Sequence, residues 1–199
     1  ILDRASDFKP GDGFRYSDSG YIVLGKLIES ATQKNYFDLL EERILIPQKL
    51  YEIQPARESV LSGITPGYMG GATNLKKDGR MKFDPSSEWT GGGLVTNPSM
   101  LVQFYGALNG GKIVTPESLD LMINSGWHNP ENKNFHYGFG LFVYPEYDSY
   151  GHGGLWPGYR THVAHYNSTG ITIAIQTNRD GPINMEDIVS RIHALASTQ

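Results

Sequence analysis

The sequence contains no cysteine, which excludes disulfide bonds and metal sites built from thiolates. It has no long run of basic residues and a formal net charge of −4 at pH 7, so nucleic acid is not an expected partner. No apolar stretch approaches the length of a membrane span, and the first residues have no targeting character. A hydrophobic fraction of 39% and an aromatic fraction of 12% are too high for a disordered chain. These features predict a globular protein with a substantial core.

Glycine is abundant, with 24 copies, and several of them surround one histidine in the stretch 150–159. Glycine is favoured where a backbone turns tightly or where a ligand must approach closely. We therefore predict a glycine-rich turn that holds His152 near a small ligand and leads into a strand over 160–166. The alternative interpretation is a turn with an exposed histidine that has no function. The glycines concerned are Gly151, Gly153, Gly154 and Gly158.

Apolar spacing, caps and turn residues predict where the regular elements lie. The expected helices cover about 19–31, 36–45, 98–108, 116–124 and a closing segment that contains Ile188, Ile192 and Leu195. The expected strands cover 68–69, 80–83, 137–144, 159–167 and 170–177. The irregular excursion over 51–88 is expected to cover a site, and 89–94 is expected to form a second glycine-rich turn.

These elements predict an α+β fold in which helices pack against an antiparallel sheet. Residues 1–135 are expected to form a mostly helical and loop region. Residues 136–199 are expected to form antiparallel strands and a closing helix. The sequence has no internal repeat, no low-complexity run and no clear linker. We therefore expect residues 1–199 to belong to one domain.

A second polar cluster, Tyr16-Ser17-Asp18, lies far upstream at the expected start of the first helix. With the histidine stretch and several intervening segments, it resembles the serine β-lactamase and penicillin-binding-protein family. The similarity is to its class C branch in particular, with D-alanyl-D-alanine carboxypeptidases and esterases. The resemblance covers nearly the whole chain and implies a β-lactamase/transpeptidase-like fold. The segments in family order are Phe8 to Ser17, Gly20 to Gly25, Gly91 to Thr96, Tyr137 to Gly140, His152 to Gly154, and Thr177-Asn178.

In this family the nucleophile comes from a Ser-x-x-Lys motif upstream of the Tyr-x-Asn motif, which Tyr16-Ser17-Asp18 resembles. We interpret this chain as a partial domain that lacks the first motif and begins just before the second. Thr73 and Lys76 have a similar spacing but lie downstream of Tyr16, so we interpret that pair as a coincidence in a loop. The resemblance then implies that this chain alone is inactive.

The resemblance also implies roles for the two polar clusters. Tyr16 would belong to the base machinery that takes the serine proton, which requires nearby cations to favour its phenolate. His152 would donate a hydrogen bond to the substrate or assist the proton relay of Tyr16. Packing at a helix entrance is the alternative for Tyr16. Metal binding by His162 and His165 is a further alternative that no motif supports.

The remaining site residues follow from the same resemblance. Gly153 and Gly154 would let the substrate lie against a strand edge, and the Leu155 N–H would be one oxyanion donor. Asp18 stands where most relatives have asparagine. An ionised aspartate only accepts hydrogen bonds, and its charge opposes formation of a phenolate at Tyr16. This substitution weakens the case for a β-lactam as the substrate.

We therefore expect part of a serine hydrolase that acts through an acyl-enzyme on an ester, amide or β-lactam. The alternative is a non-catalytic binding module that retains the fold. No metal or organic cofactor is implied. The expected partners are a small or peptide-like acyl substrate and the missing amino-terminal segment, in the same or a separate chain. By family resemblance, a periplasmic or secreted location is expected.

Overall fold

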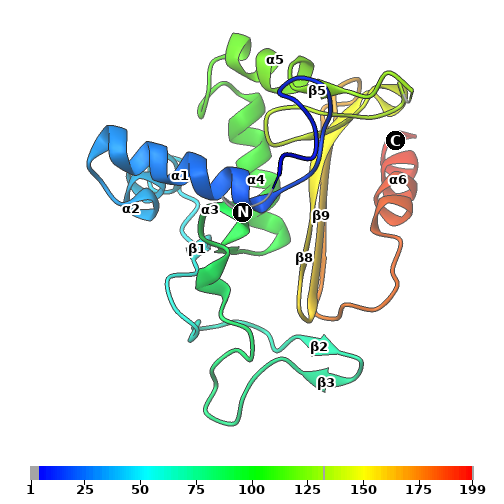
Figure 1. Ribbon diagram of the computed structural model, residues 1–199. Helices are drawn as coiled ribbons and strands as arrows, with labels where there is room; N and C mark the ends of the chain where they lie inside the picture. The colour runs from blue at the N-terminus through cyan, green and yellow to red at the C-terminus, as the bar shows by residue number, and fades with distance from the viewer. Residues whose placement is uncertain (1–4, 132, 199) are drawn as a thin grey trace.

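The computed structural model describes residues 5–131 and 133–198. Its secondary structure begins with a helical half and ends with a sheet and a closing helix (Figure 1). The helices are α1 (Asp18–Thr32), α2 (Tyr36–Leu40), a π-helix (Glu41–Leu45), α3 (Trp89–Gly92), α4 (Pro98–Asn109), α5 (Pro116–Asn124) and α6 (Met185–Ala196), with 3₁₀ turns at Pro85–Ser87 and Pro145–Tyr147. The helices expected near 19–31, 36–45, 98–108 and 116–124 and the closing helix are therefore confirmed.

An antiparallel sheet of six strands has the order β10-β9-β8-β7-β6-β5. Two small two-stranded sheets lie outside it: β1 pairs with the distant β4, and β2 pairs with β3. The α+β class with helices against an antiparallel sheet is therefore confirmed. The strands are β1 (Gln54–Pro55), β2 (Tyr68–Met69), β3 (Ala72–Thr73), β4 (Leu94–Val95), β5 (Trp127–His128), β6 (His136–Tyr137), β7 (Phe142–Tyr144), β8 (Ser149–Trp156), β9 (Tyr159–Tyr166) and β10 (Ile171–Thr177).

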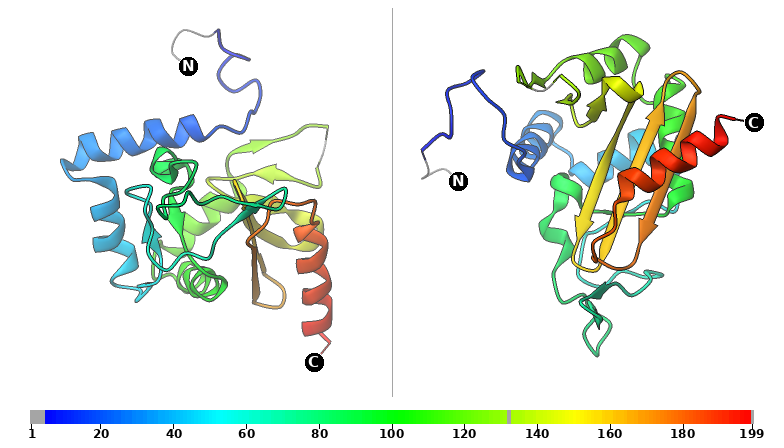
Figure 2. Two further views of the ribbon diagram at one scale, coloured as in Figure 1. Left: turned by 90° about the horizontal axis from the view of Figure 1, so that it is seen from below. Right: turned by 90° about the vertical axis from the view of Figure 1, so that its right-hand side faces the viewer.

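Apolar side chains from the long strands pack on both faces of this sheet. Helices α4 and α6 lie on opposite faces of β8–β10 (Figures 1 and 2). On the α4 face the buried cluster contains Tyr105, Leu141, Val143, Tyr150 and Val163. On the α6 face it contains Ala164, Tyr166, Ile173 and Val189. Side chains alternate between the two faces along β9, so this strand contributes residues to both buried clusters.

We predicted a turn for the glycine-rich stretch around His152. In the structure this stretch instead forms most of the continuous strand β8. It pairs residue by residue with β9, from Ser149 opposite Tyr166 to Trp156 opposite Tyr159. A Cβ at position 151 would collide with the carbonyl oxygen of Val163, so this close pairing requires glycine. The turn is confined to the end of the hairpin, where Gly158 has a φ of +89°. Pairing with β9 therefore overrides the local preference of glycine for turns.

Three further expectations differ from the structure. The strand predicted over 137–144 is two strands, because residues 138–141 form a turn in which the Gly138 N–H donates to the Leu141 carbonyl. No strand forms at 80–83; only an isolated bridge joins Leu75 and Met81. The predicted turn at 89–94 is the short helix α3 followed by β4. In each case backbone hydrogen bonds to neighbouring segments decide the local structure.

The irregular excursion over 51–88 is held against the far end of the β8–β9 hairpin. The buried side chain of Asn74 accepts a hydrogen bond from the Gly67 N–H at 2.9 Å and donates one to the Pro157 carbonyl at 2.9 Å. Apolar residues of the excursion also pack with Trp156 and Tyr159. This places β2 and β3 beside the end of the hairpin in Figure 1. The excursion therefore lies next to the last residues of β8, beyond Leu155.

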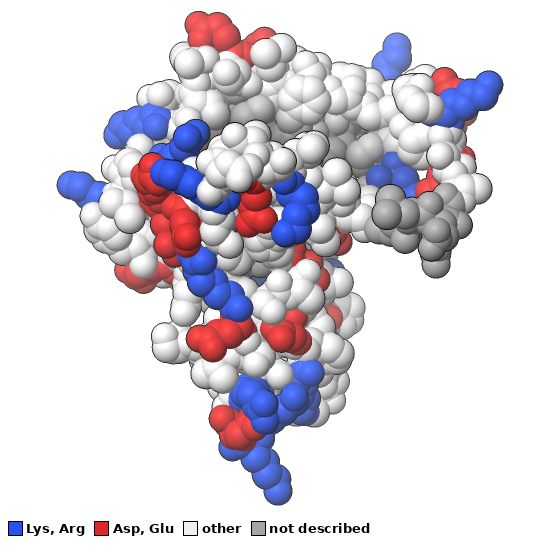
Figure 3. Space-filling model, turned by 60° about the vertical axis from the view of Figure 1, so that its left-hand side comes forward, with Lys and Arg blue, Asp and Glu red and all other residues white. Residues whose placement is uncertain are grey.

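Helix α1 has its apolar residues at helical spacing, as predicted, yet they are not packed within the described chain. Leu27 is 60% exposed, and only Gly25 is buried along the whole helix. Charged residues of both signs lie side by side on the surface formed by α1 and α2 (Figure 3). Among them are the ion pairs Lys34–Glu42 and Arg57–Asp38. The mixed charge gives this face no basic stripe for nucleic acid.

Candidate active site

Tyr16 and His152, which lie far apart in the sequence, meet at the junction of α1 and the sheet. Tyr16 precedes α1 and is 44% exposed. Its ring centroid lies 6.0 Å from that of His152, 5.6 Å from that of Tyr137 and 6.0 Å from that of Phe142. The structure therefore brings together the two residues for which catalytic roles were predicted.

Asp18 belongs to the same cluster, in the first turn of α1. Burial raises the pKa of the Tyr16 phenol, and the charge of Asp18 and its hydrogen bond to Tyr16 raise it further. Glu88 lies close enough to add to this effect, and its own pKa is raised by burial and by Asp18. Two carboxyl groups thus favour the neutral phenol over the phenolate. The described part of the chain does not provide the electrostatic field that a tyrosine base would need.

His152 is half-buried and is held by two hydrogen bonds. Its Nδ1 lies 2.6 Å from the Gly153 carbonyl oxygen, and its Nε2 lies 3.1 Å from the Tyr137 hydroxyl. Burial lowers the pKa of His152, while the Gly153 carbonyl and Asp18 partly offset this effect. The imidazole is therefore neutral near pH 7 and is available to accept a proton.

The predicted substrate-binding residues lie where β8 loses one of its two neighbours. Strand β7 pairs with β8 only from Ser149 to Gly151, whereas β9 continues to the end of β8. Beyond His152, one edge of β8 therefore has no pairing with β7. Leu155, in this part of the strand, is 69% exposed. A Cβ on Gly153 or Gly154 would make only ordinary contacts, at 3.7 Å and 3.5 Å. The packing of the described residues therefore does not require glycine at either position.

Two groups near the site were missed in the sequence analysis. Tyr137 was noted only as part of a glycine-containing motif, although its hydroxyl contacts His152. Glu88, which precedes the second glycine-rich stretch, was assigned no role although it lies beside Asp18. The first was visible as a motif, but the second had no sequence signal.

The histidines considered for metal binding do not converge. His162 lines a groove on the α6 face, whereas the His165 ring lies tilted against that of Tyr150 and hydrogen-bonds Thr172. Residues three apart on a strand point to opposite faces, which explains the separation. Within residues 5–131 and 133–198, no group of three or more His, Cys, Asp or Glu could hold a metal ion.

One serine was also overlooked. Ser6-Asp7-Phe8-Lys9 has the spacing Ser-x-x-Lys, so the sequence is not free of that pattern. Side chains three apart meet on a helix, but residues 5–13 form a loop without helix that is exposed except at the half-buried Gly13. Lys9 is therefore not held beneath Ser6 as a helical pair would be.

The contrast between Gly151 and Gly154 is testable by denaturation. We expect Gly154→Ala to change the free energy of unfolding by less than about 1 kcal/mol, because its Cβ would meet only Thr161 at 3.5 Å. Gly151→Ala should destabilise by about 2 kcal/mol or more, because its Cβ would collide with the Val163 carbonyl. Urea unfolding of both variants provides the comparison. Equal losses of unfolding free energy in the two variants would contradict the conclusion that position 151 requires glycine and position 154 does not.

The buried histidines predict how stability depends on pH. Burial lowers the pKa of His152, His162 and His165 in the folded chain. In the unfolded chain the same groups titrate near their ordinary value of about 6.5. As the pH falls below that value, the histidines of the unfolded state bind protons before those of the folded state, so the free energy of unfolding decreases. Above that value both states are unprotonated, and the full stability is present. We expect Tm to fall between pH 7.5 and 5.5, and His165→Gln to reduce the fall. A Tm that is constant or rises towards pH 5.5 would contradict this.

The comparisons with known proteins agree with this architecture. A model of the family described as Beta-lactamase matches residues 2–197. The human serine beta-lactamase-like protein LACTB, mitochondrial, is 30% identical over 103 residues, which cover 51% of this chain and 18% of that protein. A D-stereospecific amidohydrolase from Streptomyces sp. superposes with a TM-score of 0.76 and 26% identity, over 89% of this chain and 54% of that one. D-amino acid amidase from Ochrobactrum anthropi SV3 gives a TM-score of 0.67 and 26% identity, over 86% and 52%.

This chain thus spans about half the length of these solved relatives, 54% and 52%, and a smaller part of LACTB. The family match extends over almost all 199 residues, and the folds agree over most of the chain. The resemblance that the motifs indicated is therefore confirmed. The chain belongs to the beta-lactamase family.

Proposed function

We propose that this chain provides the Tyr16–His152 side of a serine hydrolase site that works through an acyl-enzyme. The observation that supports it best is the meeting of Tyr16, Asp18 and His152 beside the unpaired edge of β8. Two solved relatives are named as an amidohydrolase and an amidase. The serine would come from polypeptide outside these residues, because Ser6 and Lys9 lie in an exposed loop.

In the proposed reaction the serine oxygen attacks the acyl carbonyl while its proton passes to the base formed by Tyr16 and His152. The negative charge on the carbonyl oxygen would be stabilised by the Leu155 N–H and a second donor. The amine or alcohol then leaves with a proton from the same base, and an ester to the serine remains. Water attacks this ester in a second step, which releases the acid and restores the serine hydroxyl. Gly153 and Gly154 would leave space for the substrate along β8.

A cation is the group that this arrangement still requires. Tyr16 acts as a base only if its phenolate is favoured, yet Asp18 and Glu88 oppose that state. A lysine from the polypeptide that completes the site would be attracted by these two carboxylates. It would also lower the cost of the phenolate.

The same acidic pair favours substrates with a free amino group. Asp18 is exposed at the mouth of the cluster, where it can accept hydrogen bonds from an ammonium group and repel a carboxylate. The Ochrobactrum enzyme was solved in complex with L-phenylalanine amide. We therefore propose an amide or ester with an amino group close to the scissile carbonyl as the substrate of the complete protein.

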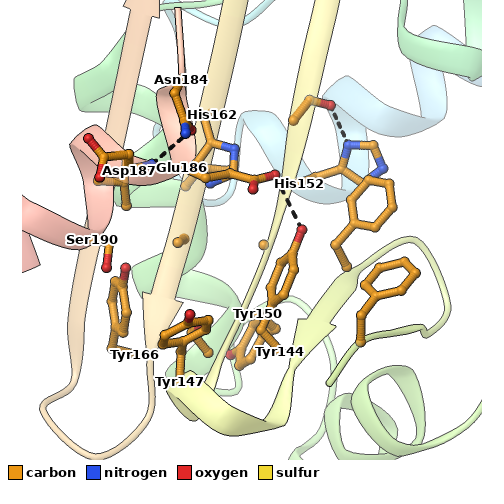
Figure 4. A pocket seen from close by; sticks show the side chains of 18 residues that line it. Tyr144, Tyr147, Tyr150, His152, His162, Tyr166, Asn184, Glu186, Asp187 and Ser190 are labelled. Atoms are coloured by element: carbon orange, nitrogen blue, oxygen red, sulfur yellow. Dashed lines mark hydrogen bonds between the residues drawn. The ribbon is translucent and has the colours of Figure 1, made fainter. Parts of the chain in front are cut away.

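Unpartnered surfaces of the chain support a larger assembly. Strand β10 has a partner on one side only among the described strands. A groove of about 620 Å³ runs between α6 and the sheet, and Tyr144, His162 and Glu186 point into it (Figure 4). Several apolar residues of α1 and α6 are also exposed: Val23, Leu24, Leu27 and Ile28 on α1, and Ile188, Ile192 and Leu195 on α6. An exposed strand edge beside apolar surface is costly in an isolated protein.

We propose that polypeptide equivalent to the uncovered half of the solved relatives pairs with β10 and fills this groove. It could belong to the same chain or to a separate one.

No helix in the described residues is long and apolar enough to span a membrane. A periplasmic or secreted location is also part of the proposal, although LACTB is a mitochondrial relative.

The proposed substrate class can be tested in the complete protein that contains this chain. We expect hydrolysis of phenylalanine amide to exceed that of its N-acetyl derivative. Asp18→Asn should lower the ratio of the two kcat/KM values about three- to tenfold, the range for one partly exposed charged hydrogen bond. Asp120→Asn, on the surface of α5, is the matched control and should leave the ratio unchanged.

An unchanged ratio in Asp18→Asn would place this residue outside the substrate contact. Hydrolysis of neither compound, with retained binding of phenylalanine amide, would favour a non-catalytic binding module instead.

A further inference from the structure

We propose that Tyr137 is a positioning residue that holds His152 with its proton on Nδ1, so that Nε2 enters the reaction as a proton acceptor. This inference rests on the proposed function, because it assigns a direction to the proton relay of that site. It concerns a residue whose side chain has no role in the reaction as described above.

The contact with the Gly153 carbonyl fixes where the proton of the neutral ring lies. A carbonyl oxygen only accepts hydrogen bonds, so the Nδ1 atom 2.6 Å away must be the donor. In a neutral imidazole the other nitrogen then carries a lone pair. The Tyr137 hydroxyl, 3.1 Å from Nε2, is therefore the donor in that contact. The Gly153 carbonyl thus selects the tautomer, and the bond donated by Tyr137 stabilises it.

Tyr137 is held firmly enough to impose this choice. Its side chain is buried, and its ring centroid lies 5.2 Å from that of Phe14 and 4.8 Å from that of Phe142. The side chain of Tyr21 on α1 lies close to its hydroxyl. The Tyr137 hydroxyl is thus enclosed between α1 and the histidine on β8.

The surroundings keep Tyr137 a donor and His152 an acceptor. Burial raises the pKa of Tyr137, and the neighbouring phenol of Tyr21 raises it further, so its hydroxyl stays protonated. The charged or titratable groups that face His152 are Asp18, Tyr16 and His162. Asp18 favours a proton on the ring once one arrives, whereas burial opposes it. His152 therefore cannot donate from Nε2 to a substrate until it has taken up a proton.

The test measures the tautomer directly, by long-range ¹H–¹⁵N NMR of the chain with labelled histidine. The wild-type protein should show a protonated Nδ1 and an unprotonated Nε2 at His152. Tyr137→Phe keeps the ring and removes only the hydroxyl. It should lower the ratio of the two tautomers about two- to tenfold, the effect of one ordinary hydrogen bond. It should also raise the pKa of His152, because the neutral ring loses the bond that its lone pair accepted.

Tyr159→Phe is the matched control, because it also removes a single phenol hydroxyl, which donates to the Thr65 carbonyl at 2.7 Å. It should change neither the tautomer nor the pKa of His152. A proton on Nε2 in the wild-type chain, or a tautomer ratio like that of free imidazole, would overturn the proposal. So would a Tyr137→Phe variant that titrates like the wild type. None of these readouts involves acyl transfer, so failure of the hydrolase proposal would be seen separately.

Discussion

Strand β8 is paired on both sides in its first part and on one side in its last part. The candidate site lies where these two parts join. At Ser149 to Gly151 it is paired on both sides and buried between two apolar layers. From Gly153 to Leu155 it is paired with β9 alone and is exposed. His152 occupies the junction, so the core fixes its backbone while its ring faces the aromatic cluster. The close approach of β9 at Gly151 is what keeps the two parts in one continuous ladder.

The charges around this junction indicate what the site still needs. Asp18 and Glu88 raise the energy of a phenolate at Tyr16, and burial keeps His152 neutral. Taken alone, the described residues hold a weak base with no cation beside it. Such a site would bind a positively charged group more readily than a negative one. A substrate ammonium has that character, and so would the lysine proposed above.

Local signals were sufficient to predict most helices. The Asn97 side chain accepts from the Met100 N–H at 3.0 Å, and Thr115 accepts from the Ser118 N–H at 3.2 Å, as their cap positions indicated. Strand β8 could not be predicted in this way, because its glycines favour a turn locally and only the register with β9 makes them a strand. The approach of Tyr137 to His152 likewise depends on the order of β6, β7 and β8 in the sheet. Family motifs identified Tyr16 and His152, but their neighbours became visible only in three dimensions.

The central claim is that Tyr16 activates a serine that lies outside these 199 residues. The most direct measurement is the rate at which a fluorophosphonate labels the complete protein, with the modified residue located by mass spectrometry. We expect one adduct, on a serine outside this chain, formed at an unchanged rate in Ser6→Ala. In Tyr16→Phe the rate should fall about a hundred- to ten-thousandfold, the usual contribution of a general base. An adduct on Ser6 or any other serine of this chain, or an unchanged rate in Tyr16→Phe, would contradict the account.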